Sequence, residues 1–123
     1  MTGCKALFDS NVIIYLSKRE IPLSFVDQFD ALFVSIITYM EILGYPFSNP
    51  KEELFIKELL SVFQTIFIDQ RIADITVDIR KKNRIKLPDA IISATAISES
   101  LELVTRNVDD FSKIDVKISN PFD

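Results

Sequence analysis

The sequence predicts an α/β fold with a mostly parallel sheet, and three observations support this prediction. Short apolar segments alternate along the chain with longer stretches of helical pattern. The apolar segments are continuous rather than alternating, which is typical of strands that are covered on both faces. The chain of 123 residues contains no internal repeat and no linker, so we expect a single domain over residues 1–123.

In the first half of the chain, apolar runs precede stretches of helical pattern. Residues 6–8 form the first candidate strand, and the helical pattern of residues 12–16 follows it. Residues 31–36 form the second candidate strand. Thr38 and Glu41 follow it, and their spacing matches a capping box at a helix start. Each candidate strand therefore leads directly into a polar turn or the start of a helix.

A third helix is predicted from Pro50 to Phe63. Asn49 is a suitable N-cap, Pro50 suits the first helical position, and Glu52 lies at the third. The apolar residues of this helix cover more than one face, which is wider than the stripe of a one-sided surface helix. The remaining candidates are strands at residues 65–68, 101–105 and 116–118, and helices at residues 70–83 and 89–100.

The absence of His and the single Cys restrict the chemistry of the chain. They exclude thiolate zinc sites, Ser-His-Asp triads and His-based ribonuclease chemistry. Any hydrolysis must therefore use carboxylates, hydroxyls, Lys or Arg, most simply around a hard cation held by oxygen ligands. A single Cys cannot form an internal disulfide, no apolar run approaches the roughly 20 residues of a membrane helix, and residues 1–5 hold no signal-peptide cleavage site. We therefore expect a cytoplasmic protein.

Four of the 18 acidic residues stand at one predicted edge of the sheet. Asp9 ends the first strand, and Glu41 follows the second. Asp89 begins the helix that leads into the 101–105 strand, and Asp110 lies just past the end of that strand. In a parallel sheet, all these positions belong to the carboxyl edge, where open α/β sheets bind their ligands.

Each of these acids has a simpler explanation as a helix cap or a solvated turn residue. Converging carboxylates, however, repel one another and raise each other's pKa unless a cation neutralises them. Their joint placement therefore favours a site for Mg²⁺ or Mn²⁺.

Four sequence blocks contain these acids and together span nearly the whole chain. They are Leu7-Phe8-Asp9-Ser10-Asn11, Ile37-Thr38-Tyr39-Met40-Glu41-Ile42, Leu87-Pro88-Asp89-Ala90 with the helical residues that follow, and Leu103-Val104-Thr105-Arg106-Asn107-Val108-Asp109-Asp110-Phe111. These blocks resemble the signature blocks of the PIN-domain family and occur in that family's order. The short chain is similar to the VapC toxins of type II toxin–antitoxin systems.

The resemblance implies a three-layer α/β/α fold with a sheet of four or five strands. It also implies Mg²⁺- or Mn²⁺-dependent endonucleolytic cleavage of RNA, a homodimer, and inhibition by a partner antitoxin. Asp9, Glu41 and Asp89 match the family's acidic positions. We favour Asp110 as the fourth acid, with Asp109 as the alternative, because the family often has Asp where this chain has Asn107.

We expect the site residues to have different roles in the reaction. Asp9, Asp89 and Asp110 would anchor metal ions, and Glu41 would hold a metal or accept a proton from the attacking water. Three polar residues could orient ligands or water, although hydroxyls in such turns more often serve as backbone partners. They are Ser10, Thr105 and Asn107.

The net charge of −4 argues against a general nucleic-acid binder, but the basic residues are unevenly distributed. The run at residues 80–86 directly precedes Pro88 and Asp89. Its cations either guide the RNA backbone or complement the dipole at a helix end. The candidate RNA-binding residues are Arg80, Arg84, Lys86 and Arg106. The wide apolar surface of the helix at residues 50–63 also has two explanations. It is either packed in the core or available in part for binding the antitoxin or a second copy of the chain.

Other classes of function fit the sequence less well. A haloacid-dehalogenase phosphatase would use Asp9 as a phosphoryl-accepting nucleophile, but it requires a second Asp where this chain has Asn11. A receiver-type signalling domain requires an early acidic pair and a late Lys, and it fits no better. The main alternative is a degenerate PIN-like module that binds RNA or a protein partner without cleavage, which Asn107 leaves open.

Overall fold

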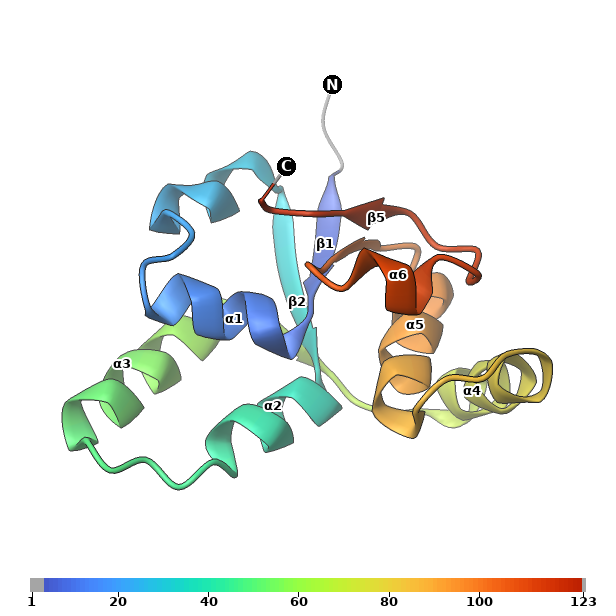
Figure 1. The fold of residues 1–123 in the computed structure, drawn as a ribbon, viewed down its shortest axis with the longest axis horizontal. Helices are drawn as coiled ribbons and strands as arrows, with labels where there is room; N and C mark the ends of the chain where they lie inside the picture. The colour runs from blue at the N-terminus through green and yellow to red at the C-terminus, as the bar shows by residue number, and fades with distance from the viewer. Residues whose placement is uncertain (1–3, 123) are drawn as a thin grey trace.

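The computed structural model describes residues 4–122, which form a five-stranded parallel sheet with helices on both faces (Figure 1). Residues 1–3 and residue 123 lie outside the described residues, and with them part of the segment predicted to hold no signal-peptide cleavage site. The strand order is β3-β2-β1-β4-β5, so β1 lies at the centre of the sheet. The predicted fold class is confirmed. The strands are β1 (Lys5–Phe8), β2 (Ala31–Ser35), β3 (Gln64–Ile66), β4 (Glu102–Val104) and β5 (Ile118–Ser119).

The helices follow the predicted stretches closely, with two additions. A short 3-10 helix, η1, and a four-residue helix, α6, were not predicted. No helix in the described part of the chain is long and apolar enough to cross a membrane. The helical elements are α1 (Ser10–Ser17), η1 (Leu23–Gln28), α2 (Ile36–Leu43), α3 (Pro50–Leu60), α4 (Gln70–Lys82), α5 (Leu87–Glu99) and α6 (Val108–Phe111).

The central strand β1 contributes to the cores on both faces of the sheet, because successive side chains of a strand point to opposite sides. Phe8 is fully buried on the face that α1 and α3 cover, and its ring packs edge-on against Phe29 and Phe63. Leu7 is fully buried on the other face, against Ile92 of α5. This two-sided burial explains why β1 is a continuous apolar run.

Helix α5 lies between the sheet and α4, and its residues 90–96 are all buried. It begins two residues earlier than predicted, at Leu87, because Pro88 is compatible with the first turn of a helix. Asp89 therefore lies inside the first turn rather than at the cap, which is Lys86. The first turn of this buried helix thus holds Asp89 at the carboxyl edge of the sheet.

Helix α2 is capped by Ser35, the last residue of β2. The Ser35 hydroxyl is fully buried and accepts a hydrogen bond from the Ile37 backbone N–H at 3.1 Å. Thr38 and Glu41 lie within this helix and do not form a capping box at its start. The cap fixes the direction in which α2 leaves the sheet, and with it the position of Glu41.

Candidate active site

Asp9 lies at the centre of the candidate site, immediately after β1 and at the N-cap of α1. Its side chain is buried, with 6% exposed. One carboxylate oxygen accepts the Ser10 backbone N–H at 2.7 Å, and the other accepts the Thr105 hydroxyl at 2.9 Å. Thr105 is itself fully buried at the end of β4. Two neighbouring strands therefore hold the Asp9 carboxylate in a fixed orientation.

Glu41 reaches the same region from α2 through Ser10. The Ser10 hydroxyl donates to Glu41 Oε1 at 2.7 Å, and its oxygen lies 3.2 Å from the Thr38 hydroxyl oxygen. Ser10 thus links α1 to α2 and orients a glutamate that is otherwise exposed. Thr38, which the sequence pattern indicated only as part of a cap, supports this link.

Asp9, Glu41 and Asp89 line one cavity of about 250 Å³ at the carboxyl edge of the sheet. This edge lies where the strand order reverses direction between β1 and β4, the usual ligand position in open α/β sheets. Polar and apolar neighbours complete the lining. They are Ser10, Asn11, Ile14, Ile42, Ile92 and Asn107.

The electrostatic state of the site reflects burial and repulsion between like charges. Burial raises the pKa of Asp9, and the nearby charges of Glu41 and Asp110 raise it further, while the hydrogen bonds from Thr105 and Ser10 oppose the shift. Burial also raises the pKa of Asp89, and Asp9, Asp110 and Glu41 add to this effect. All four predicted acids therefore interact electrostatically across one small region.

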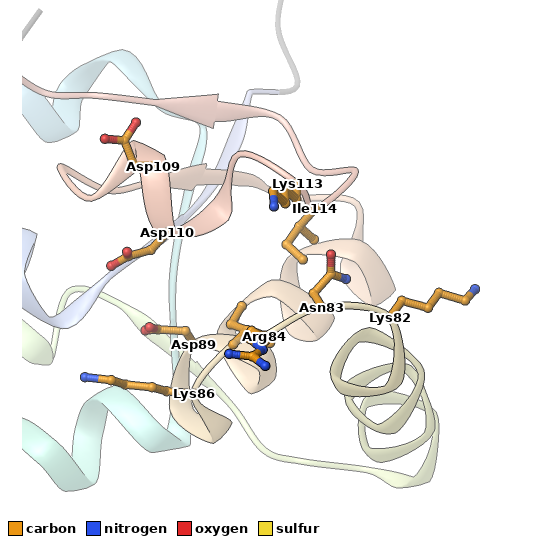
Figure 2. A pocket seen from close by; sticks show the side chains of 10 residues that line it. Lys82, Asn83, Arg84, Lys86, Asp89, Asp109, Asp110, Lys113 and Ile114 are labelled. Atoms are coloured by element: carbon orange, nitrogen blue, oxygen red, sulfur yellow. The ribbon is translucent and has the colours of Figure 1, made fainter.

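Asp110 rather than Asp109 is directed toward the other acids. Figure 2 shows the Asp110 carboxylate on the same side as that of Asp89, whereas the Asp109 carboxylate points away from Asp89. Asp110, unlike Asp109, is among the charges that raise the pKa of Asp9. Asn107 lines the cavity, and its backbone N–H donates to the Thr105 hydroxyl at 3.0 Å.

The donor chemistry of this site fits a divalent cation of the Mg²⁺ or Mn²⁺ type. Carboxylate oxygens are the ligands that these ions prefer, and a cation would relieve the repulsion that raises the pKa of Asp9 and Asp89. Within residues 4–122, however, no three acidic or Cys side chains form a group able to hold a metal ion as they stand. Asp9, Glu41 and Asp89 thus line one cavity, and Asp110 lines the neighbouring one, without forming a complete coordination site among the described residues.

The candidate RNA-binding residues lie in different surroundings. Arg84 and Lys86 line a larger cavity of about 610 Å³, which Asp89, Asp109 and Asp110 also line. Lys113, which was not among the predicted RNA-binding residues, lines it as well. Lys113 follows Asp110 by three residues, and this spacing on one turn could have indicated it. Arg80 is exposed on α4 and lines neither cavity.

Arg106 contacts the C-terminal segment instead of the carboxylates. Its guanidinium carbon lies 4.3 Å from the centroid of the Phe122 ring and 5.4 Å from that of Tyr15. It also lies within hydrogen-bond distance of the Tyr15 hydroxyl, at 3.3 Å. These cation–π contacts attach the end of the chain to α1.

Comparison with known proteins places most of this chain within one family model. The model of the PIN domain matches residues 6–117, a segment that contains all four acids. A chain of a toxin–antitoxin complex from Klebsiella pneumoniae is 38% identical, with a TM-score of 0.80, and the match covers 94% of this chain and 97% of that one.

Two other solved structures show similar chains at lower identity. A chain of FitAcB from Neisseria gonorrhoeae is 28% identical, with a TM-score of 0.78 and coverage of 95% and 98% of the two chains. A chain of VapBC-1 from nontypeable Haemophilus influenzae is 25% identical, with a TM-score of 0.80 and coverage of 97% and 99%. Comparison with curated proteins gives no significant match.

Proposed function

The chain belongs to the PIN domain family, as its motifs predict, and from this premise we propose that it is a metal-dependent endoribonuclease. PIN domains are generally nucleases that use divalent metals. The observation that carries the proposal is the cavity at the carboxyl edge, which Asp9, Glu41 and Asp89 line in a chain without His. The similarity to a chain of a toxin–antitoxin complex further supports the role of toxin in such a pair.

In this proposal each side chain has a distinct task. Asp9 is the fixed ligand, because both of its oxygens are already oriented by hydrogen bonds. Asp89 and Asp110 supply further carboxylates, and Asn107 offers a neutral amide. A bound Mg²⁺ or Mn²⁺ would activate water and neutralise the charge that develops on the phosphodiester.

Glu41 is placed to hold a ligand or to accept a proton from the attacking water. It is exposed, and the Ser10 hydroxyl orients it at 2.7 Å. Asp110 is also exposed, so both side chains can turn toward a cation, Glu41 by giving up its bond to Ser10, while Asp9 stays in place.

The test of this function is cleavage of a mixed RNA with added Mn²⁺. We expect Asp9→Asn to lower the rate by at least about 100-fold, because an amide cannot replace the charge of a central carboxylate ligand. Asp27→Asn is a matched control at an exposed residue that lines none of the cavities near the acids. Equal cleavage of RNA by the wild type and Asp9→Asn would contradict the proposal. If neither protein cleaved RNA, the proposal would also fail, and the alternative of a binding module without cleavage would be favoured.

The same assay decides the identity of the fourth acid. We expect Asp110→Asn to lower the rate strongly and Asp109→Asn to have a small effect, because only the Asp110 carboxylate is directed toward Asp89. The reverse order would assign the role to Asp109.

The proposed partners are an antitoxin and a second copy of the chain, in the cytoplasm. A cavity of about 780 Å³ between α1, α2 and α3 is lined by Tyr45, Phe47 and Phe55, which gives a partner an apolar surface. Phe55 belongs to the helix for which the sequence left open core packing or a partner surface. Co-expression with a short reading frame directly upstream should suppress cleavage, and light scattering should give the mass of two chains. Unsuppressed cleavage or a monomer mass would contradict the respective partner.

A further inference from the structure

A second cavity lies beside the first, and Asp89 lines both. Asp109 and Asp110 also line this second cavity, together with the basic residues described next. It measures about 610 Å³ and lies between the segment that joins α4 to α5 and the end of α6 (Figure 2). Arg84 and Lys86 come from the first of these segments, and Lys113 comes from the second. The two walls are thus far apart in the sequence and meet only in the folded chain.

The cations of this cavity are available to a ligand. Arg84, Lys86 and Lys113 are exposed, and none forms an ion pair with a residue in the described part of the chain. Lys82 is different, because its ammonium pairs with Asp78 at 3.2 Å on α4. Figure 2 accordingly shows Lys82 directed away from the carboxylates, whereas Lys86 extends beside Asp89.

We propose that this cavity is a subsite for a backbone phosphate of the RNA, next to the phosphate that is cleaved. Arg84 and Lys86 hold the phosphate from one wall, and Lys113 holds it from the other. The inference rests on the proposed function, since it places the scissile phosphate at the neighbouring carboxylates. A chain of net charge −4 repels RNA overall, so binding depends on local groups of unpaired cations such as this one.

Because Asp89 lines both cavities, the two hollows lie side by side. In this proposal, a strand whose scissile phosphate lies beside Asp9 and Asp89 would place a neighbouring phosphate in the second cavity. Arg84 can bind a phosphate through two parallel N–H bonds, whereas Lys113 acts as a point charge. The subsite therefore recognises the backbone and carries no base specificity.

A simpler alternative is that these cations only offset the charge of the acids. Lys86 does lower the pKa of Asp89, against the larger effects that raise it. If Lys113 acted in the same way, its removal would strengthen binding of Mn²⁺ and leave RNA binding in EDTA unchanged. A phosphate subsite predicts the opposite for RNA, so one experiment separates the two.

The experiment measures binding of a fluorescein-labelled single-stranded RNA of about 12 nucleotides by anisotropy, in EDTA. We expect Lys113→Gln and Arg84→Gln each to weaken binding about two- to fivefold, the range for one exposed ion pair. Each change should also reduce the slope of log K against log salt by about 0.7, as one lost phosphate contact does. Lys81→Gln is the matched control, because Lys81 belongs to the same basic run but lines neither cavity.

The outcomes separate the subsite from the nuclease proposal. Equal loss in Lys81→Gln and Lys113→Gln would overturn the subsite, since net charge alone would then explain the effect. Unchanged binding in Lys113→Gln, or no binding by wild type, would overturn it as well. If the selective loss occurs but Mn²⁺ gives no cleavage, the subsite stands and the ribonuclease proposal fails. Thermal unfolding of the variants checks that these exposed substitutions leave the fold intact.

Discussion

At the scale of single residues, the Asp9–Thr105 contact connects the fold to the proposed chemistry. Asp9 is a buried carboxylate whose pKa is raised mainly by burial, and the Thr105 hydroxyl is the strongest influence that opposes this. A buried carboxylate oxygen that loses its donor costs free energy, because water cannot replace the lost bond. Thr105 therefore stabilises the ionised form that a metal ligand requires.

Thr105→Val should lower the free energy of unfolding by about 1–3 kcal/mol, since it removes the donor and keeps the shape of the side chain. Thr95→Val is the matched control. Thr95 is buried to the same degree, but its hydroxyl donates to the Ile91 carbonyl within α5. This carbonyl already accepts a backbone hydrogen bond of the helix. Urea denaturation measures both changes. Equal losses of unfolding free energy in the two variants would show that the hydrogen bond to Asp9 contributes no more to stability than the one within α5.

The positions of the acids at the edge of the sheet could be predicted from the sequence, but the surroundings of the cations could not. Asp9 and Asp89 could be placed because the end of a strand and the start of a helix are local features of the sequence. The contact of Arg106 with Phe122 and the position of Lys113 opposite Arg84 depend on tertiary packing. A single sequence carries little information about contacts between surface side chains that are far apart in the chain.

At the scale of elements, the caps of α2 and α3 permit a matched comparison. Ser35 caps α2, which carries Glu41, and Asn49 caps α3, which carries none of the four acids. The Asn49 side chain accepts the Lys51 backbone N–H at 2.9 Å. The two caps therefore make the same kind of bond at different distances from the proposed chemistry.

Ser35→Ala and Asn49→Ala should each lower the free energy of unfolding by about 1 kcal/mol, because each removes one N-cap bond. Only Ser35→Ala should also lower the rate of RNA cleavage, since it loosens the start of the helix that positions Glu41. Urea denaturation and the Mn²⁺ cleavage assay measure the two effects. A similar drop in cleavage for Asn49→Ala would indicate general destabilisation instead.

All five predicted strands and the longer predicted helices are present, since their apolar runs and start signals are strong. The η1 and α6 helices were not predicted, because elements of six and four residues have too little periodicity to detect. Helix α6 is held by Phe111, which is fully buried, rather than by any local signal. Packing therefore explains the elements that the sequence pattern could not predict.

At the scale of the whole molecule, the clustered acids reduce stability in the absence of metal. The pKa of Asp9 and of Asp89 is raised above the ordinary value of 3.8, so ionisation of either group opposes folding. This penalty is fully present above the folded pKa and disappears as the pH falls toward the unfolded value. A cation that binds only the folded chain removes the penalty at neutral pH.

Mn²⁺ should therefore raise the Tm at neutral pH, by the equivalent of about 2.7 kcal/mol at 100 times its Kd. The increase should shrink on acidification, because protonated carboxylates no longer bind the ion. Differential scanning calorimetry with and without EDTA measures both effects. The increase should persist in Asp27→Asn and be lost in Asp9→Asn. An increase of the same size in both variants would place the ion elsewhere.

The order of the strands was not predicted, although the edge on which the acids meet was. The edge follows from the parallel arrangement alone, whereas the central position of β1 depends on which strands pair. Leu7 of β1 pairs with Leu103 of β4, a partner that is distant in the sequence. Such long-range pairing leaves no local pattern to interpret.

This pairing also determines when the four acids can come together during synthesis. Asp9 is translated 96 residues before its partner Thr105, and the nearby Asp110 follows later still. A nascent chain therefore cannot assemble all four acids until translation has passed Asp110. The proposed active site is absent from the chain up to that point.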